Sequence, residues 1–523
     1  MAEVSMVAPR RARLITILAF LGFFGVGAGW AVAMPWDGAP DEQAHITRAV
    51  GVVGGGLTAP PANVVVDGQP RPLSGVWQTV PAGAFRTSPP CFAFKPRQPA
   101  NCLKPSPANP ERPVQRFSAT GRYQPTYGAV VGWPLKWWPN ETGLVLARLV
   151  SVALAAGFLT AAVRSILIWS RRPFLLAGLL VATTPMTMHL AGAVNPNGLE
   201  IAAAIAMWTA LIPLVLGAGP PDRRLLVLLA VSASVVACVR PAGPMFVALA
   251  GGVLLATAGR ERLIRLARDK RVWITTAEVA LAGLASGIWT LAMKATELVP
   301  VPGGAGLGPG DALRVVLIER IPFYLKSMVG LFGWVDVEMP GGFYAVWFAA
   351  VGFLAIAAFA AGGRADRWRL ALTVLVAFGL PFQMDIFGAE ENGMMAQGRY
   401  ILPSAVGAAL LAAYIIDERV VLTPALVRSS TRWLAVLTLP LHLIALGYTM
   451  VRYQHGLNAQ DPVLNPFSGI WRPSMGSGTA LLVTTLGLVA LGGLVWLVSR
   501  SPLAPKVPAA IRRPDTSAAL PAP

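Results

Sequence analysis

Residues 14–34 read LITILAFLGFFGVGAGWAVAM, an uncharged and almost wholly apolar run of the length that an α-helix needs to cross a bilayer. The following segment, 35–45, reads PWDGAPDEQAH and places Asp41, Glu42 and His45 just beyond the end of that run. Charge near hydrocarbon is costly, so paired acids at the mouth of a membrane helix are a functional-site hypothesis by default. This stretch therefore predicts a membrane protein with chemistry at one face of the membrane.

The composition supports the same class. Hydrophobic residues make up 55% of the chain and charged residues 13%, and the mean hydropathy is +0.58. A soluble domain of 523 residues could not hide so much apolar surface in one core. The formal net charge of +18 does not indicate a nucleic-acid partner, because Lys and Arg are scattered between apolar runs. We therefore predict an all-α polytopic membrane protein surrounded by membrane lipids.

Apolar stretches of about 16 to 25 residues, the length that a bilayer demands, occur about twelve times. They lie at approximately 14–34, 142–168, 174–194, 198–218, 225–239, 241–258, 273–295, 342–362, 370–388, 401–416, 433–451 and 478–498. The fifth and sixth are short and meet at Arg240-Pro241, so one broken helix pair is an alternative, and the count is good to about two.

Basic residues set the predicted topology. With the N-terminus inside, alternate connections contain Arg171-Arg172, Arg223-Arg224 and the clusters within 260–271, 364–369 and 419–432. This distribution satisfies the positive-inside rule along the chain. A cleaved signal peptide at the N-terminus is a weaker alternative, because the first apolar run is longer than a typical signal core.

The topology divides the chain into predicted regions. These are a cytoplasmic N-terminus at 1–13, a first transmembrane helix at 14–34, an extracytoplasmic loop at 35–141, a multi-span region at 142–498 with outer loops at 296–341, 389–400 and 452–477, and a disordered cytoplasmic tail at 499–523.

The loop at 35–141 is too long and too rich in Pro for a simple connector, so we expect it to fold as a cap. Cys91 and Cys102 lie close together in it. Thiols can oxidise on the outer side, and a disulfide closing this small loop would contribute about 2–3 kcal/mol to local order. Two unpaired thiols are the alternative.

Aromatic residues gather near the end of the same loop. Tyr123 and Tyr127 precede Trp133, Trp137 and Trp138. One interpretation is an interfacial belt that anchors the loop. The other is a platform that stacks on a sugar or on the lipid portion of a substrate.

Six short motifs occur in order along the chain: PDEQAH at 40–45, YQPTY at 123–127, ARLVS at 147–151, GAVNPNGLE at 192–200, GWVD at 333–336 and QGRYILP at 397–403. With them the chain resembles the GT-C class of membrane glycosyltransferases. More closely, it resembles a bacterial domain-of-unknown-function family of polytopic predicted membrane proteins usually assigned to that fold. The resemblance covers about residues 14 to 403.

The resemblance implies a GT-C-like bundle of about twelve transmembrane helices in the bacterial cytoplasmic membrane, with its active site on the extracytoplasmic side. It also implies an enzyme that transfers a sugar from a polyprenyl-phosphate-linked donor to a cell-envelope polysaccharide, glycolipid or protein acceptor. In that class an acidic residue on the first outer loop is the usual catalytic base. The matching positions here are Asp41 and Glu42.

The residues themselves fit such chemistry. Sugar transfer from a phosphate needs a carboxylate to take the proton of the acceptor hydroxyl and cations to stabilise the leaving phosphate. We predict Asp41 as the base, with Glu42 sharing that role or orienting the acceptor, and Asp37 as a lower-ranked substitute. On a helix starting near Pro40, His45 would share a face with both acids, where it would tune them, bind the acceptor or complete a divalent metal site. The alternative for both acids is simple capping of a helix.

For the phosphate the leading candidate is Arg399, whose fork can grip two oxygens, followed by Arg240 and Lys326. Each has an alternative as a cation snorkelling near the headgroups. Asp336, Asn195 and Glu200 are further candidates for contacts with sugar hydroxyls. For the last two the alternatives are a cap on the fourth span and a hydrogen bond inside the bundle.

Two other function classes remain as alternatives. A transporter or flippase of lipid-linked or small polar substrates would also suit about twelve spans, but it predicts charges near the midplane and resembling halves, and neither is evident. A non-catalytic scaffold of envelope assembly would tolerate loss of Asp41. The chain lacks a Gly-Lys-Ser/Thr phosphate loop and a His-Glu-x-x-His motif, so nucleotide hydrolysis and zinc proteolysis are poorly supported.

Overall fold

The computed structural model describes residues 8–65, 72–87, 89–170, 172–297, 306–419, 422–458 and 464–500. Most of the predicted tail at 499–523 therefore lies outside the described residues, as do Arg171 and part of the outer loop at 296–341.

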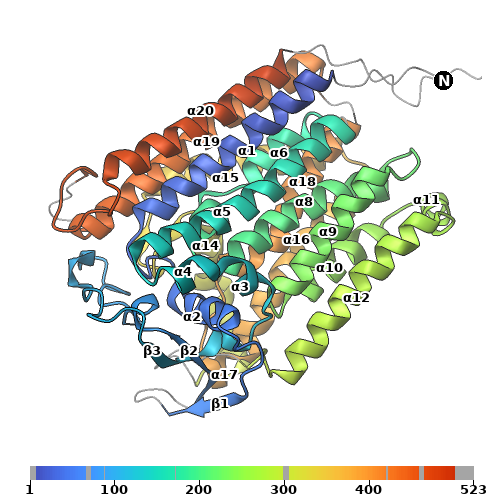
Figure 1. Cartoon of the computed structure of the whole chain (residues 1–523). Helices are drawn as coiled ribbons and strands as arrows, with labels where there is room; N and C mark the ends of the chain where they lie inside the picture. Colours follow the sequence, from blue (N-terminus) through green and yellow to red (C-terminus); the bar gives the residue numbers. More distant parts are fainter. Residues whose placement is uncertain are drawn as a thin grey trace, which may run out of the picture.

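Within the described residues, nine helices are long and apolar enough to cross a membrane, by length and composition. They are α1 (Pro9–Ala33), α5 (Glu141–Arg164, continued by a π-helical turn η4 at Ser165–Trp169), α8 (Pro196–Leu216), α12 (Lys270–Ala292), α15 (Gly341–Ala361), α16 (Arg364–Phe387), α18 (Gly398–Glu418), α19 (Pro424–His455) and α20 (Ser477–Ser499). They form one bundle, and Figure 1 shows α1 running alongside α20 on one side of it.

The other three predicted spans are shorter helices. The segment 174–194 forms α6 (Leu175–Ala182) and α7 (Pro185–Ala191), which are separated at Thr183-Thr184 because Pro185 lacks an N–H and disfavours a helical residue before it. The next pair is α9 (Arg223–Val239) and α10 (Gly243–Ala256), broken where Arg240 is extended. Each predicted apolar segment is thus helical, while the number of membrane crossings stays a prediction.

Small residues let α1 approach α20 closely. A Cβ added at Gly25 would lie 2.8 Å from the Cα of Gly487, and one at Gly29 would collide with Thr484. The hydrophobic effect contributes little to the association of helices inside a bilayer, because lipid chains are as apolar as Leu. The association depends instead on close van der Waals packing. Glycine on both helices permits that contact.

The segment 35–141, which was predicted to be the first outer loop, folds as a small cap with its own strands. It contains α2 (Glu42–Val53), β1 (Pro61–Val64), β2 (Leu73–Pro81), β3 (Pro113–Ser118), α3 (Thr126–Val131), α4 (Trp133–Trp137) and the 3₁₀ turns η1 (Ala82–Ala84), η2 (Ala100–Cys102) and η3 (Ala119–Arg122). The strands make an antiparallel sheet in the order β1-β2-β3, with Val76 opposite Ser118. The fold is mostly helical as predicted, but it is not purely all-α.

Shorter elements connect the long helices. They are α11 (Arg260–Ala267), α13 (Pro309–Val315), the π-helical turn η5 (Val316–Arg320), α14 (Ile321–Val329), β4 (Leu331–Phe332), β5 (Val337–Glu338) and α17 (Ala389–Asn392). Figure 1 places the cap, with α2 and the sheet, at one end of the bundle, and α11 at the other. The ends of the bundle thus differ in chemistry: one holds Asp41 and its neighbours, and the other holds the basic run of α11.

Candidate functional site

Asp41 precedes α2 in a left-handed backbone conformation, with φ of 62°. Its side chain makes no capping hydrogen bond to the helix. That role belongs to Asp37, whose Oδ1 accepts from the backbone N–H of Gln43 at 3.0 Å. Capping therefore does not account for the side chain of Asp41, and the helix begins after it rather than at Pro40.

The carboxylate of Asp41 pairs with Arg399, which lies 358 residues away in the first turn of α18. Nη2 of Arg399 donates to Oδ2 of Asp41 at 2.7 Å and to the hydroxyl of Tyr400 at 3.0 Å. The Asp41 side chain is 45% exposed, whereas that of Arg399 is 5% exposed. Asp41 is thus the accessible member of a pair whose cation is held inside the protein.

Arg399 retains unused hydrogen-bonding capacity. Its Nε and Nη1 are buried and have no hydrogen-bond partner within the described part of the chain. Buried donors are normally paired, so unpaired N–H groups of a buried guanidinium suit an anionic ligand. Nε and Nη1 lie on either side of Nη2, the nitrogen that binds Asp41, so each offers a separate donor near the carboxylate.

Arg240, between α9 and α10, adds a second cation. Its Nη1 lies 2.9 Å from Oε2 of Glu200, a fully buried residue of α8. The guanidinium also lies over two aromatic rings, 6.0 Å from the centroid of Tyr123 and 5.3 Å from that of Tyr400. Tyr123 thus reaches this cluster from the cap, while Glu200 acts as a hydrogen-bonding group inside the bundle.

These charges set the ionisation of Asp41. Burial raises the pKa of its carboxyl, but attraction to the charges of Arg399 and Arg240 opposes this, and the pKa lies below its ordinary value. Asp37 differs, because burial holds its pKa well above the ordinary range. Asp41 is therefore ionised at neutral pH, as a proton acceptor must be, and its side chain is accessible to a substrate, whereas Asp37 is fully buried.

His45 faces Tyr123, with ring centroids 5.9 Å apart. Burial lowers the pKa of its imidazole to about 3, although the charge of Asp41 opposes this, so the ring is neutral near pH 7. The described residues contain no group of three or more His, Cys, Asp or Glu side chains that could hold a metal ion. The suggested divalent metal site at His45 therefore has no ligand cluster there.

Glu42 lies in a different environment from its neighbour. Its side chain and that of Arg148 are both fully buried. Nε and Nη2 of Arg148 donate to the two carboxylate oxygens at 2.8 and 2.6 Å, and the backbone N–H of Val194 donates to Oε1 at 3.0 Å. The two adjacent acids thus diverge, and Glu42 ties the cap to the bundle.

Arg148 is the residue that sequence reasoning undervalued. It lies in α5 and also donates to the carbonyls of Ala31, Met34 and Pro35, which close the C-terminal end of α1. The ARLVS motif at 147–151 contains this arginine, but its partner Glu42 lies 106 residues away in the sequence.

The side chains of Asn195 and Tyr127 are engaged in hydrogen bonds inside the protein. The Asn195 side chain caps α8 by accepting from the N–H of Asn197, and it donates to the carbonyl of Pro40, directly before Asp41. The hydroxyl of Tyr127 lies 2.9 Å from Oγ of Ser151 in the interior. Asn195 thus holds the backbone beside Asp41, and Tyr127 joins α3 to α5.

Asp336 and Arg452 form a second buried pair, with Oδ2 and Nη2 2.5 Å apart. Arg452 also donates to the carbonyls of Phe92, Lys95 and Gln98, which lie in the loop closed by a disulfide between Cys91 and Cys102. Trp334 completes the link, because its Nε1 donates to the carbonyl of Asp37 at 2.8 Å. Asp336 therefore connects the loop between α14 and α15 to the cap, through Arg452.

Lys326 is not part of the Asp41 cluster, since its ammonium pairs with Glu338 and both side chains are about half exposed. The predicted aromatic group is also peripheral: Trp133, Trp137 and Trp138 pack on one another and are 40%, 61% and 49% exposed. Exposed Trp at one end of the bundle fits an interfacial belt, and its use as a substrate platform stays a prediction.

A network that the sequence did not indicate positions Arg399. Asp385 in α16 is fully buried and accepts from Arg320 at 2.9 Å, from the hydroxyl of Tyr324 at 2.6 Å and from the backbone N–H of Ala396 at 2.9 Å. Because Ala396 lies three residues before Arg399, this network fixes the chain that leads into α18.

The fold and site define a mostly helical, multi-pass membrane protein with charged residues from distant segments gathered at one end of its bundle. The sequence profile of the family described as Predicted membrane protein (DUF2142) matches residues 24–408, and the chain belongs to this family. That match confirms the predicted membership of a family of polytopic membrane proteins.

Two solved structures share a partial likeness with the chain. ArnT from Cupriavidus metallidurans in the apo state is 16% identical over 72% of this chain and 66% of that chain, with a TM-score of 0.36. ArnT from the same organism bound to undecaprenyl phosphate is 14% identical over 94% of this chain and 77% of that chain, with a TM-score of 0.39. No curated protein matches the sequence.

Proposed function

We propose that this protein is a GT-C-type glycosyltransferase that moves a sugar from a polyprenyl-phosphate-linked donor to a cell-envelope acceptor, at the extracytoplasmic face of a bacterial cytoplasmic membrane. The observation that carries the proposal is the pair of Asp41, an accessible carboxylate, and Arg399, a buried guanidinium whose Nε and Nη1 have no partner within the described residues. A base and buried donors for an anion are thus adjacent, as the reaction requires.

In the proposed reaction Asp41 is the base. A hydroxyl of the acceptor approaches its carboxylate and gives up its proton as the oxygen attacks the anomeric carbon of the donor sugar. The bond from that carbon to the phosphate oxygen breaks, and the electron pair leaves with the polyprenyl phosphate. The lowered pKa keeps Asp41 ionised before the reaction, and its exposure leaves the carboxylate within reach of a substrate.

The leaving phosphate gains negative charge as this bond breaks. Arg399 supports it with its positive charge and with one of its two remaining donors, Nε or Nη1, while its Nη2 stays with Asp41. Arg240 adds a second positive charge and has an unpaired buried Nε of its own within the described residues. Fixed cations in a site away from bulk water stabilise such charge strongly, because they need no reorganisation during the step.

The remaining residues hold this arrangement in place. Glu42 and Arg148 position the turn that presents Asp41, and Asp385 positions the chain before Arg399. Tyr123, stacked near Arg240, gives the acceptor or the sugar an aromatic wall. None of these groups needs to exchange a proton for the reaction to proceed.

The proposed side of the membrane follows from charge. The helix α11, which contains Arg260, Arg262 and Arg265, lies at the end of the bundle opposite the cap (Figure 1). The positive-inside rule assigns such an end to the cytoplasm, which leaves the cap and Asp41 outside. Polyprenyl-linked sugars are then used at the outer face.

The test compares envelope glycans in a deletion strain that carries wild type, Asp41→Asn or Glu338→Gln at equal abundance. Glu338→Gln is the matched control, since Glu338 is an exposed acid that lies in a different ion pair. Glycan composition and linkage are measured by mass spectrometry. We expect wild type and the control to restore a missing sugar and Asp41→Asn to transfer it roughly 10²- to 10⁴-fold more slowly. If Asp41→Asn restores the glycan as fully as wild type, Asp41 is not the base and the proposal fails.

A further inference from the structure

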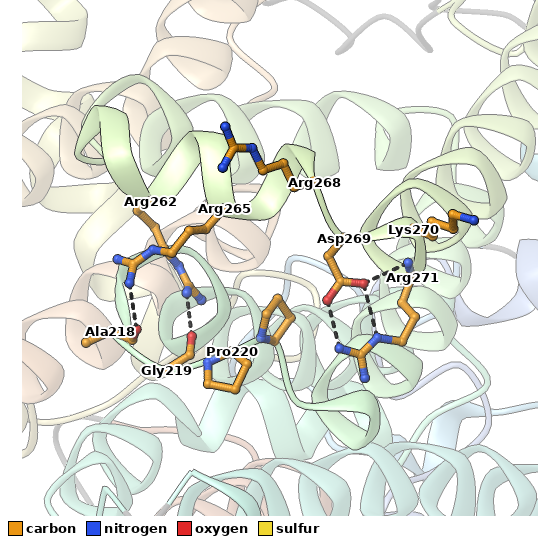
Figure 2. Close-up of a pocket in the computed structure, with 10 residues that line it drawn as sticks. Ala218, Gly219, Pro220, Arg262, Arg265, Arg268, Asp269, Lys270 and Arg271 are labelled. Atoms are coloured by element: carbon orange, nitrogen blue, oxygen red, sulfur yellow. Dashed lines mark hydrogen bonds and ion pairs between the residues drawn. The ribbon is translucent and has the colours of Figure 1, made fainter.

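At the end of the bundle opposite the cap, the structure contains a pocket of about 650 Å³. One wall is the connection between α8 and α9, residues 218–221, and the other is α11 with the start of α12 (Figure 2). The lining includes five cationic side chains and one carboxylate: Arg262, Arg265, Arg268, Lys270, Arg271 and Asp269.

Two of these cations are already paired. Arg262 is buried and donates to the carbonyls of Leu214 and Gly219, so it closes the C-terminal end of α8. Nε and Nη2 of Arg271 donate to the two carboxylate oxygens of Asp269 at 3.1 and 2.7 Å. The only carboxylate of the pocket is thereby neutralised.

The other three cations have capacity left. Arg265 makes one hydrogen bond, to the carbonyl of Ala218 at 3.2 Å. The side chains of Arg268 and Lys270 form no hydrogen bond or ion pair with the residues that the structure describes, and Figure 2 draws none for them. All three are exposed. The pocket therefore carries an uncompensated positive charge, which suits an anion.

The apolar residues beside the pocket indicate which kind of anion. Ile264 on α11 is 40% exposed, and Trp273 and Ile274 at the start of α12 are 61% and 67% exposed. The indole Nε1 of Trp273 donates to the carbonyl of Ala267 at 2.8 Å, which fixes the ring next to the basic run. Exposed Trp and Ile that alternate with cations along the chain are typical of the boundary between acyl chains and headgroups. A soluble anion would gain nothing from these apolar side chains, whereas a lipid would contact both zones.

We propose that this pocket binds the phosphate headgroup of an anionic membrane lipid, which Arg265, Arg268 and Lys270 hold above the apolar side chains of Ile264 and Trp273. Basic pockets between helices on the cytoplasmic side of membrane proteins recognise such headgroups. The site is independent of the proposed transferase reaction, because it lies at the opposite end of the bundle from Asp41. It would anchor α11 and α12 at a defined depth.

The test measures binding of dioctanoyl phosphatidylglycerol to the detergent-purified full chain by native mass spectrometry and by titration. The pocket variant is Arg265→Gln/Arg268→Gln/Lys270→Gln. The control is Arg10→Gln/Arg13→Gln/Arg364→Gln, which removes the same charge from exposed positions outside the pocket. We expect the pocket variant to weaken saturable binding by roughly tenfold or more and the control by less than about twofold, since each nearby cation adds to the attraction of an anionic lipid.

Other outcomes would overturn the proposal. Equal weakening in both triple variants would mean a general attraction to charge and no built site. Equal binding of dioctanoyl phosphatidylcholine would remove the role of net charge. Displacement of the lipid by inorganic phosphate at the same concentration would assign the pocket to a soluble anion. Arg268 is exposed, and its side chain forms no hydrogen bond or ion pair within the described part of the chain, so we expect Arg268→Gln alone to fold as wild type does.

Discussion

Replacing Glu42 with Gln separates a structural acid from a catalytic one. Glu42 and Arg148 are fully buried, and their two hydrogen bonds are 2.8 and 2.6 Å long. The substitution removes the negative charge and turns one acceptor into an amide donor that faces another donor. Breaking a buried pair in this way costs about 3–5 kcal/mol, because an uncompensated charge stays inside the protein.

The other contacts of Arg148 place the cost at the lower end of that range. Its guanidinium keeps three carbonyl acceptors, of Ala31, Met34 and Pro35, at 2.7 to 3.2 Å. The amide oxygen of Gln also keeps the N–H of Val194 as a donor. We therefore expect Glu42→Gln to lower the free energy of unfolding by about 3 kcal/mol.

The assay is the unfolding temperature of the detergent-purified protein, followed by the fraction that stays monodisperse after heating. Asp41→Asn is the comparison, because the Asp41 side chain is 45% exposed and Asn tolerates the left-handed conformation at that position. We expect Asp41→Asn to lose activity with a smaller drop in unfolding temperature, and Glu42→Gln to lose stability first.

A double variant tests the coupling directly. If Glu42 and Arg148 act as a pair, Glu42→Gln combined with Arg148→Gln will be less destabilised than the two single changes added together. The reasoning is refuted if Glu42→Gln unfolds at the wild-type temperature and still abolishes sugar transfer. Glu42 would then be the working acid, despite its burial.

Three further predictions follow from the acids and the disulfide. Asp37→Asn should raise the unfolding temperature at about pH 8 more than at about pH 5. Burial raises the pKa of Asp37, so the contribution of this carboxyl to stability is lost as the pH rises through its pKa in the folded protein. Equal changes in unfolding temperature at both pH values would contradict this. Burial raises the pKa of Asp41, but the charge of Arg399 outweighs burial and lowers it. The rate of sugar transfer by membrane vesicles should therefore not fall between about pH 7 and about pH 5. Arg399→Gln should shift the pH at which this rate falls on the acid side to a higher value. Cys91→Ser/Cys102→Ser should lower the local stability of the cap by about 2–3 kcal/mol, seen as faster limited proteolysis of that loop, and an unchanged cleavage rate would argue against it.

Much of the fold was accessible from the sequence because the bilayer imposes simple rules on length and polarity. Runs such as 14–34 and 478–498 have too few polar groups for any other environment, and both are helices. The break at Pro185 and the strands of the cap were harder to predict. The former depends on a local backbone effect within an apolar run, and the strands are short and gain stability only when they pair.

The candidate site was also predictable from the sequence only in part. Sequence alone determined that Asp41 and Glu42 follow a membrane-length helix, that Arg399 opens another, and that basic clusters alternate along the chain. Only the tertiary structure decided which acid is accessible, because the choice depends on partners far away in sequence: Arg399 is 358 residues from Asp41, and Arg148 is 106 residues from Glu42. Adjacent acids on a turn point in different directions, and the packing of α5 and α18 encloses one of them and leaves the other open to solvent.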